Sequence, residues 1–263
     1  MNMNDNTILI TGGTSGIGFE LARQLLALNN TVIITGRDPA RLAAAKAQLP
    51  AVKTAPCDVT DPRSIVALHE HISAAYPALN VLINCAGVMR KLNLNTAGAD
   101  LEDTTREITT NLNGTIWTDL QFLPLLKRQP RATIVNVSSG LAFVPMPIAP
   151  VYCASKAAIH AFTLSLRLQL KQSTVRVVEL APPGTETPLF HADFTPQDVA
   201  GLVPMPVATL VRHAIAGLAR DVEEIRPGLS NVLKIASRVA PGLMLRQLGK
   251  SVDLMLAQQR APG

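Results

Sequence analysis

Residues 7–18 read TILITGGTSGIG, and the rest of the chain is organised around this stretch. Its first four residues form a short apolar run typical of a buried strand, and a helical apolar pattern begins at Phe19. A strand, a glycine-rich turn and a helix in this order form a βα unit that binds nucleotides. Gly12, Gly16 and Gly18 let the backbone turn sharply and approach a pyrophosphate, which would sit on the helix N-terminus. A glycine-rich loop alone is often only a tight turn, but both flanks here favour nucleotide binding.

Similar units follow along the chain. Apolar runs predict strands at residues 31–35, 52–57, 81–83, 133–137 and 175–180, with helices at 39–49, 61–75, about 102–128 and from Tyr152 onward. This alternation predicts an α/β fold, a Rossmann-like doubly wound parallel sheet in three α/β/α layers. The length fits a single domain, 1–263. The ligand of such a sheet lies at the carboxyl ends of the strands, where Thr11, Asp58, Asn84 and Ser139 occur.

Composition narrows the function further. The net charge of +5 is spread along the chain, and no Lys/Arg block is interleaved with aromatic residues, so no nucleic acid partner is expected. Cys57, Cys85 and Cys153 are an odd set, and no Cys/His cluster has metal-ligand spacing, so no metal site is expected. The start carries no signal-peptide pattern, and no apolar run approaches the ~18 residues of a membrane span. We therefore expect a soluble, cytoplasmic protein that acts on a small molecule.

The end of the second predicted strand bears on the choice of coenzyme. In NAD sites an acidic residue at this point binds the ribose hydroxyls, whereas an arginine accommodates the 2′-phosphate of NADP. Here Gly36 takes the acidic place and Arg37 follows it. Asp38 could be that acid, but before Pro39 it reads better as the N-cap of a helix with proline at its first position. The pattern favours NADP(H) over NAD(H), and the alternative for Arg37 is a solvated loop charge.

Tyr152 and Lys156, four residues apart on a predicted helix, share one face. An ammonium beside a phenol favours the phenolate, so we expect the pKa of Tyr152 to lie below its usual value of about 10. Ser139 follows the strand at 133–137. A serine at a strand end and a Tyr–Lys helix suit reversible proton transfer at an alcohol or carbonyl. The spacing alone fits a surface tyrosine and lysine equally well.

The last third of the chain is less regular. Residues 187–206 are interrupted by prolines, as a mobile loop over a site would be, and we interpret 187–220 as the substrate-loop region. The tail, residues 229–263, combines apolar and basic residues in a helical pattern. Such a helix can lie on a membrane or cover a substrate cleft, but a further packing helix with solvated basic residues is favoured. The helix after Tyr152 has a wide apolar face that could meet a second subunit.

Together these residues resemble the short-chain dehydrogenase/reductase family over about residues 7–190. The fingerprint TGxxxGxG runs from Thr11 to Gly18, and the family's NNAG element appears as Asn84-Cys85-Ala86-Gly87. The start Asn6 to Gly13, the element Thr35-Gly36-Arg37 and the tail Pro241 to Ala257 look like the oxidoreductases of bacterial D-alanylation operons. Cys85 replaces the usual second asparagine, and the C-terminal Gly-Gly strand ending of fatty-acyl ketoreductases is missing.

The resemblance implies a catalytic tetrad of Asn111, Ser139, Tyr152 and Lys156. Tyr152 would exchange a proton with the substrate oxygen, Ser139 would bind that oxygen, and Lys156 would lower the pKa of the tyrosine and bind the nicotinamide ribose. Asn111 would hold a water that links Lys156 to solvent. The residues implied to bind the coenzyme are Gly12, Thr14, Ser15, Gly16, Ile17, Gly18, Arg37, Asp58, Val59, Asn84, Ala86, Gly87, Tyr152, Lys156, Pro183, Gly184, Thr185 and Thr187.

The implied function is hydride transfer between NADP(H) and a small carbonyl or alcohol, in a homodimer or homotetramer. A 3-oxoacyl-carrier-protein reductase would share the whole site. A nucleotide-sugar epimerase or dehydratase would keep its coenzyme bound and show no net oxidation of NADPH. A non-catalytic NADP(H)-binding regulatory protein would bind the coenzyme and reduce nothing.

Overall fold

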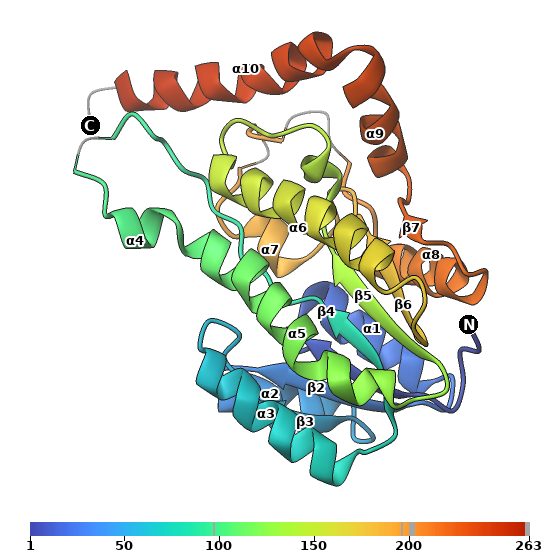
Figure 1. The fold of residues 1–263 in the computed structure, drawn as a ribbon. Coiled ribbons are helices and arrows are strands. Elements are labelled where there is room, and N and C mark those ends of the chain that lie inside the picture. The colour runs from blue at the N-terminus through green and yellow to red at the C-terminus, as the bar shows by residue number, and fades with distance from the viewer. Residues whose placement is uncertain (97, 196, 200–202, 261–263) are drawn as a thin grey trace.

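The computed structural model describes residues 1–96, 98–195, 197–199 and 203–260, with side chains up to Leu256 (Figure 1). Seven parallel strands form one sheet in the order β3-β2-β1-β4-β5-β6-β7. The strands are β1 Thr7–Thr11, β2 Thr31–Gly36, β3 Lys53–Pro56, β4 Leu79–Asn84, β5 Ala132–Val137, β6 Val175–Leu180 and β7 Glu224–Ile225. The predicted doubly wound α/β fold is confirmed.

Helices cover both faces of the sheet because alternate strand residues point to opposite sides. Ile8 and Ile10 pack in a buried cluster with α1, α2 and α8, whereas Leu9 packs on the other face with α3, α5 and α6 (Figure 1). The helices are α1 Gly16–Leu26, α2 Pro39–Gln48, α3 Pro62–Ala75, α5 Gly114–Lys127, α6 Pro150–Gln169 and α8 Val207–Ala219. Both clusters are almost entirely aliphatic, and together they fix the strand ends rigidly.

The strand order reverses at β1, which lies between β2 and β4. A crevice opens at such a switch point, at the carboxyl ends of the strands. The glycine-rich turn between β1 and α1 lies there, and Thr11 pairs with Asn84 at the end of β4. Asp38 caps α2 as predicted, since its carboxylate accepts the backbone N–H groups of Ala40 and Arg41 at 2.8 and 3.3 Å.

Three elements differ from the sequence prediction. The helix expected at 102–128 is broken into α4 Leu101–Thr104, a π-helix Ile108–Asn113 and α5. The strand β7, which pairs with β6, was not predicted, because two residues are too few to show an alternating pattern. The tail forms two helices, α9 Leu229–Val239 and α10 Pro241–Arg260, because a proline disfavours helical backbone in the residue before it.

The described residues of the predicted loop at 187–206 include one short helix, α7 Pro188–His191. The end of this loop is joined to the segment just before its start by backbone hydrogen bonds, from Met205 N–H to the carbonyl of Gly184 at 2.8 Å and from Glu186 N–H to that of Met205 at 3.0 Å. Residues 196 and 200–202 of this predicted loop lie outside the described residues. None of the described helices is both long and apolar enough to cross a membrane.

Candidate active site

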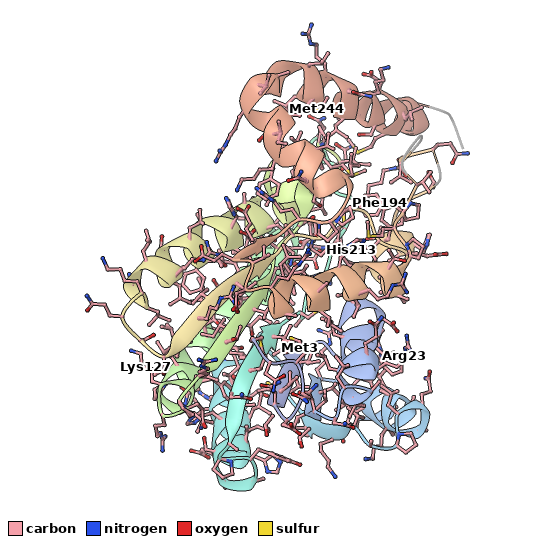
Figure 2. The ribbon with its side chains drawn as sticks, turned by 90° about the vertical axis from the view of Figure 1, so that its right-hand side faces the viewer. Met3, Arg23, Lys127, Phe194, His213 and Met244 are labelled. Atoms are coloured by element: carbon pink, nitrogen blue, oxygen red, sulfur yellow. The ribbon has the colours of Figure 1, made fainter. Side chains whose placement is uncertain are left out.

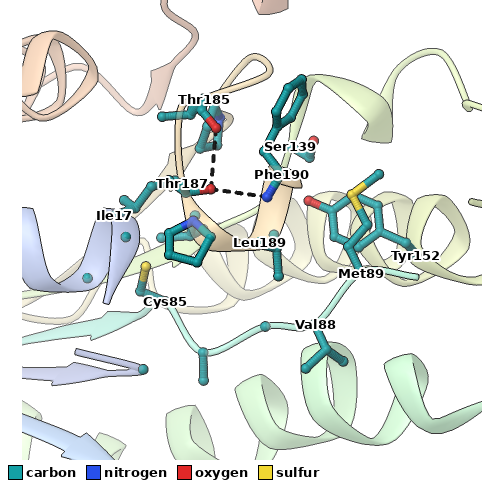
Figure 3. Close-up of a pocket in the computed structure, with 18 of the residues that line it drawn as sticks. Ile17, Cys85, Val88, Met89, Ser139, Tyr152, Thr185, Thr187, Leu189 and Phe190 are labelled. Atoms are coloured by element: carbon teal, nitrogen blue, oxygen red, sulfur yellow. Dashed lines mark hydrogen bonds between the residues drawn. The ribbon is translucent and has the colours of Figure 1, made fainter. Parts of the chain in front are cut away.

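A cavity of about 540 Å³ runs along the carboxyl ends of the strands, from the glycine-rich turn to the tail (Figure 3). It gathers most of the predicted site residues from segments that are far apart in the chain. The predicted residues that line it are Gly12, Thr14, Ser15, Gly16, Ile17, Gly18, Arg37, Asp58, Val59, Ala86, Gly87, Ser139, Tyr152, Lys156, Pro183, Gly184, Thr185 and Thr187. Asn84 and Asn111 are not among the lining residues.

The glycine-rich turn has the shape of a cradle for a pyrophosphate. Gly12 and Gly16 have φ angles of +66° and +55°, which favour glycine, and a Cβ on Gly12 would lie 2.6 Å from the Cα of Ala86. Ser15, the N-cap of α1, makes no side-chain capping hydrogen bond, and the first turn of α1 holds no acidic residue. Backbone N–H groups and the positive end of the helix dipole are therefore open to an anion, which fits the pyrophosphate of a dinucleotide.

Thr187 closes the cradle from the opposite side. A Cβ on Gly16 would lie 3.3 Å from Cγ2 of Thr187, so the substrate-loop region and the glycine-rich turn are nearly in contact. Thr187 caps α7: its hydroxyl donates to the carbonyl of Thr185 at 3.3 Å and accepts the N–H of Phe190 at 3.4 Å (Figure 3). A ligand on the cradle would thus be held between α1 and α7.

Two arginines lie at the far end of the cavity, beside the ends of β2 and β3. Arg37 and Arg41 are both exposed and both line the cavity. Arg41 donates to the Ser15 hydroxyl at 3.0 Å, which ties it to the edge of the pyrophosphate cradle. Sequence reasoning missed Arg41, although its place in the first turn of the helix capped by Asp38 was a usable signal. Asp58 also lines this end, and its carboxylate accepts the N–H and hydroxyl of Thr60.

Asn84 lies in the core rather than on the cavity. Its amide nitrogen donates to Oδ1 of Asp119 at 2.7 Å and to Oδ1 of Asn136 at 2.9 Å, so it links β4 to α5 and β5. Burial raises the pKa of Asp119 to about 7, against the hydrogen bonds from Asn136 and Asn84 that lower it. Through these hydrogen bonds the Asn84 side chain aligns β4 with β5 and α5 at the edge where the cavity opens.

Ser139 stands at the turn that follows β5. Its Oγ accepts the N–H of Leu141 at 3.1 Å, which leaves the hydroxyl proton free to donate. The next residue, Gly140, donates its N–H to the carbonyl of Pro182 at 2.8 Å. Ser138, the residue before Ser139, also lines the cavity, but its hydroxyl donates to the buried carboxylate of Glu179. Ser139 therefore stays our prediction for the serine that binds the substrate oxygen.

Tyr152 and Lys156 lie on the same face of α6, and both are buried. The Lys156 ammonium is 5.7 Å from the centre of the Tyr152 ring and donates to the carbonyl of Val137 at 2.8 Å. Burial raises the pKa of Tyr152 to about 12, with Ser139 opposing the rise, and burial lowers the pKa of Lys156 to about 8. Our expectation of a lowered tyrosine pKa is therefore wrong for this structure, because loss of hydration outweighs the hydrogen bond with Ser139 that lowers the pKa.

Asn111 lies in the π-helix before α5 and is fully buried. Its amide nitrogen donates to the carbonyl of Val88 and to the hydroxyl of Ser155, both at 3.0 Å, and its oxygen accepts the N–H of Val88 at 2.8 Å. A Cβ on Gly87 would lie 3.3 Å from this oxygen and 3.6 Å from Nζ of Lys156. Asn111 thus positions the segment after β4 beside Lys156. A π-turn at this point is typical of functional sites.

The part of the cavity around Tyr152 is apolar, and sequence reasoning missed most of it. Met89 lies close to the Tyr152 ring in Figure 3, and Phe194 lies between the tail and α8 in Figure 2. Tyr152, Phe194 and Met255 of α10 share one buried cluster. Leu229, Leu233 and Leu248 of the tail line the cavity as well. The tail therefore covers the cleft, and our favoured interpretation of it as one more packing helix was too narrow.

Among the described residues, one group has ligand atoms close enough for a metal ion. His160, Glu179 and Glu224 place theirs within 4.8 Å of one another. Glu224 is already paired with two cations of the chain, Lys234 at 2.5 Å and Arg226 at 3.5 Å. Those side chains supply the positive charge that a metal would bring.

Comparisons with known proteins agree with this geometry. A family model described as short chain dehydrogenase matches residues 6–198. The "uncharacterized oxidoreductase DltE" of Bacillus subtilis (strain 168) is 42% identical over 250 residues, which cover 94% of this chain and 98% of that protein. A short-chain dehydrogenase from Sphingobium yanoikuyae in complex with NADPH superposes with a TM-score of 0.78 at 27% identity, covering 91% of this chain and 95% of that one.

A short chain dehydrogenase from Burkholderia cenocepacia J2315 in complex with NADP has the same fold, with a TM-score of 0.81 at 24% identity over 94% of this chain and 99% of that one. The family match covers most of the chain, and the likeness to the Bacillus protein covers nearly all of it. This chain therefore belongs to the short-chain dehydrogenase family of oxidoreductases and is similar to DltE within it.

Proposed function

We propose that this protein interconverts a carbonyl and an alcohol by hydride transfer with NADP(H), using Tyr152 as the general acid and base. The observation that carries the proposal is that Ser139, Tyr152 and Lys156 line the same cavity as the glycine-rich cradle. A proton donor, an oxygen-binding hydroxyl and a buried cation beside a dinucleotide site are what carbonyl reduction requires.

The chain's own residues would act on the substrate oxygen as follows. When bound, the coenzyme supplies or accepts hydride at its nicotinamide ring. Tyr152 keeps its proton at neutral pH, since burial raises its pKa to about 12, so in reduction it is the acid that gives the proton from Oη to the carbonyl oxygen. Ser139 donates its free hydroxyl proton to the same oxygen and stabilises the charge that develops on it.

Lys156 and Asn111 would support this transfer. Within the described part of the chain, one of the three N–H donors of Lys156 is used, by Val137, and the others are available to the nicotinamide ribose and the phenol. Burial lowers the pKa of this ammonium to about 8, so it can pass on a proton near neutral pH. One lone pair of the Asn111 oxygen is used by Val88, and the other can hold the water that returns the proton.

The preference for NADP(H) rests on the two arginines at the adenosine end. Arg37 and Arg41 line the cavity there, and a guanidinium matches a phosphate with paired hydrogen bonds. The carboxylate of Asp38, which an NAD site would direct at the ribose hydroxyls, is engaged in capping α2. The Sphingobium yanoikuyae relative in complex with NADPH supports the same choice.

A panel of ketones, aldehydes and alcohols, followed by NADPH absorbance and repeated with NADH, tests the proposal. We expect NADPH-dependent reduction of at least one carbonyl, lost in Tyr152→Phe. A 3-oxoacyl thioester belongs in the panel, because a carrier-protein reductase would prefer it. Coenzyme binding without any turnover would instead identify a non-catalytic regulatory protein, and coenzyme that stays bound without net oxidation would identify an epimerase or dehydratase.

We also propose that the protein forms a homodimer or homotetramer through α5 and α6. Leu120 of α5 and Leu164 and Leu168 of α6 are exposed, and Leu168 is 70% accessible. Exposed leucines on neighbouring long helices favour burial against a second copy. Light scattering after size exclusion tests this: we expect Leu168→Glu to shift the mass toward the monomer, and a monomeric wild type would contradict the proposal.

A further inference from the structure

We infer that the carbonyl substrate is an uncharged and mainly apolar ketone or aldehyde, bound beneath a roof that α9 and α10 form over Tyr152. This inference rests on the proposed function, because it names the substrate class of the same site. It follows from the kind of side chains that surround the reacting groups and from the way the tail is fixed above them.

Apolar side chains from four separate segments line the cavity around Ser139 and Tyr152, and Thr110 and Ser138 add hydroxyl groups to the lining. The apolar lining residues are Val88, Met89, Leu141, Met146, Leu189, Phe190, Phe194, Val199, Leu229, Leu233 and Leu248. Figure 3 shows Met89 and Leu189 on the side of the cavity where Ser139 and Tyr152 lie. A substrate that reaches Tyr152 would therefore be surrounded by aliphatic, thioether and phenyl groups.

Apart from Lys156, the charged residues that line the cavity lie at its other end. Among the described lining residues, the charged side chains apart from Lys156 are Arg37, Asp38, Arg41 and Asp58, which follow β2 and β3. The Lys156 ammonium is buried beneath the site and donates to a backbone carbonyl. A carboxylate or phosphate on the substrate would lose its water near Tyr152, and Lys156, the one cation among the described lining residues there, is assigned to the nicotinamide ribose and the phenol, so such substrates are disfavoured.

The roof is fixed to the site by a close approach of α9. A Cβ on Gly140, the residue after Ser139, would lie 2.6 Å from Oγ of Ser230 and 3.2 Å from Cδ1 of Leu233. Glycine at this position therefore lets α9 pack directly on the turn that carries Ser139. This contact places Leu233 beside the reacting groups. Leu233 is therefore the tail residue that we expect to contact the substrate and to determine which substrates bind.

Two further contacts hold the tail in place. The Lys234 ammonium pairs with Glu224 of β7 at 2.5 Å and lies 4.7 Å from the centre of the Phe143 ring, so α9 is tied both to the sheet and to the loop after Ser139. Met255 of α10 is buried in the cluster that contains Tyr152 and Phe194. The roof is thus formed by packed apolar side chains, so each apolar group of a substrate that it buries makes binding more favourable.

The first experiment compares 2-alkanones of four to eight carbons with 2-oxo acids of the same chain lengths, and with an aldose, under NADPH. We expect kcat/KM for the 2-alkanones to rise by roughly fourfold per added methylene. The matched 2-oxo acids should be reduced at least about 100-fold less efficiently, because the carboxylate is buried unpaired. A higher kcat/KM for the 2-oxo acids, for the aldose or for a 3-oxoacyl thioester would overturn the inference and leave the proposed function intact.

The second experiment reverses the selectivity with one residue and uses its neighbour as control. Leu233→Arg should lower kcat/KM for 2-octanone by roughly tenfold or more and raise it for 2-oxooctanoate, since the guanidinium supplies the missing partner. Ile235→Arg adds the same charge to the same helix at a position that is 57% exposed and does not line the cavity. It should change neither substrate by more than about twofold. Equal changes of kcat/KM in the two variants would contradict the inference that the roof determines substrate specificity.

Binding separates a failure of the inference from a failure of the proposed function. Calorimetry on Tyr152→Phe with bound NADP⁺ should show 2-octanone binding with a negative heat-capacity change, and weaker or no binding of 2-oxooctanoate. The same titration decides the inference if Leu233→Arg does not fold or if no carbonyl is turned over. Preferential binding of the 2-oxo acid would reject it.

Discussion

Replacing both Arg37 and Arg41 by alanine should cost this protein its preference for NADPH. Both guanidiniums are exposed, so each contact with a 2′-phosphate is screened by water. Two unit charges 4 Å apart attract by about 1 kcal/mol in bulk water and by about 4 kcal/mol at a protein surface. We take about 1–2 kcal/mol per arginine, which extends below the ~1.5–3 kcal/mol found for hydrogen bonds to charged groups because both contacts are exposed.

Each single variant should therefore raise KM for NADPH by roughly 5–30-fold and leave KM for NADH within about threefold. The double variant should lose the sum of the two effects, or less if both arginines contact the same phosphate oxygens. Initial rates with each coenzyme at saturating ketone give the ratio directly. Because the contacts are exposed, the NADPH preference of the wild type should also shrink as ionic strength rises.

Arg63→Ala is the matched control, since it removes one exposed positive charge near the start of α3 without touching the cavity. It should leave both KM values unchanged within about twofold. Equal losses of NADPH and NADH affinity in the Arg37 and Arg41 variants would refute the reasoning, because only the 2′-phosphate distinguishes the coenzymes. Faster turnover of the wild type with NADH would refute it as well.

Three further variants test the surroundings of the site. Gly140→Ala should lower kcat/KM and reduce stability by about 1–3 kcal/mol, because the added methyl group would push α9 away from the turn after β5. Adding Ser230→Ala should partly restore both quantities. No change in activity or Tm in Gly140→Ala would contradict the close approach. Lys91→Met should raise KM for the ketone but not for NADPH, because it leaves the buried carboxylate of Asp198 in the substrate-loop region, 2.6 Å away and 1% exposed, without its ion pair. An additional Asp198→Asn should lower the ketone KM part of the way back. An unchanged KM in Lys91→Met would show that the pair does not hold the loop. Asp119 keeps its proton to about pH 7 in the folded protein and only to about pH 4 when unfolded, so the folded state binds more protons between these values. The free energy of unfolding should therefore fall by up to about 4 kcal/mol as pH rises through this range. Urea denaturation of Asp119→Asn at several pH values should lack this fall, and an identical fall in the variant would exclude Asp119 as its source.

The fold was predictable because each buried strand is a run of aliphatic residues between recognisable helix starts. Asp38 and Asp61, each followed by a proline, begin α2 and α3 as expected, and both carboxylates cap their helices. β7 could not be predicted from the sequence, because its two residues form a strand through pairing with β6 and show no local pattern. We did not predict the break between α9 and α10, although Pro241 was a usable signal for it, and no local pattern shows where the two helices pack.

For the candidate site, the sequence predicted which polar residues lie together but not how deeply they are buried. Motif spacing led to Ser139, Tyr152 and Lys156, which do line one cavity. The pKa of Tyr152 was mispredicted because helix spacing reports which residues are neighbours but not how deeply they are buried. Leu233 could not have been singled out, because its role depends on the approach of α9 to Gly140, which is a long-range packing contact.

The central claim is that the phenol of Tyr152 exchanges a proton with a substrate oxygen beside the bound coenzyme. The most direct measurement is a single-turnover reduction of 2-octanone by the NADPH-loaded protein, wild type against Tyr152→Phe, with NADPH affinity measured by its fluorescence in both. The account predicts a rate at least about 100-fold lower in the variant with NADPH affinity within about threefold of the wild type. Equal rates in the two proteins would contradict it.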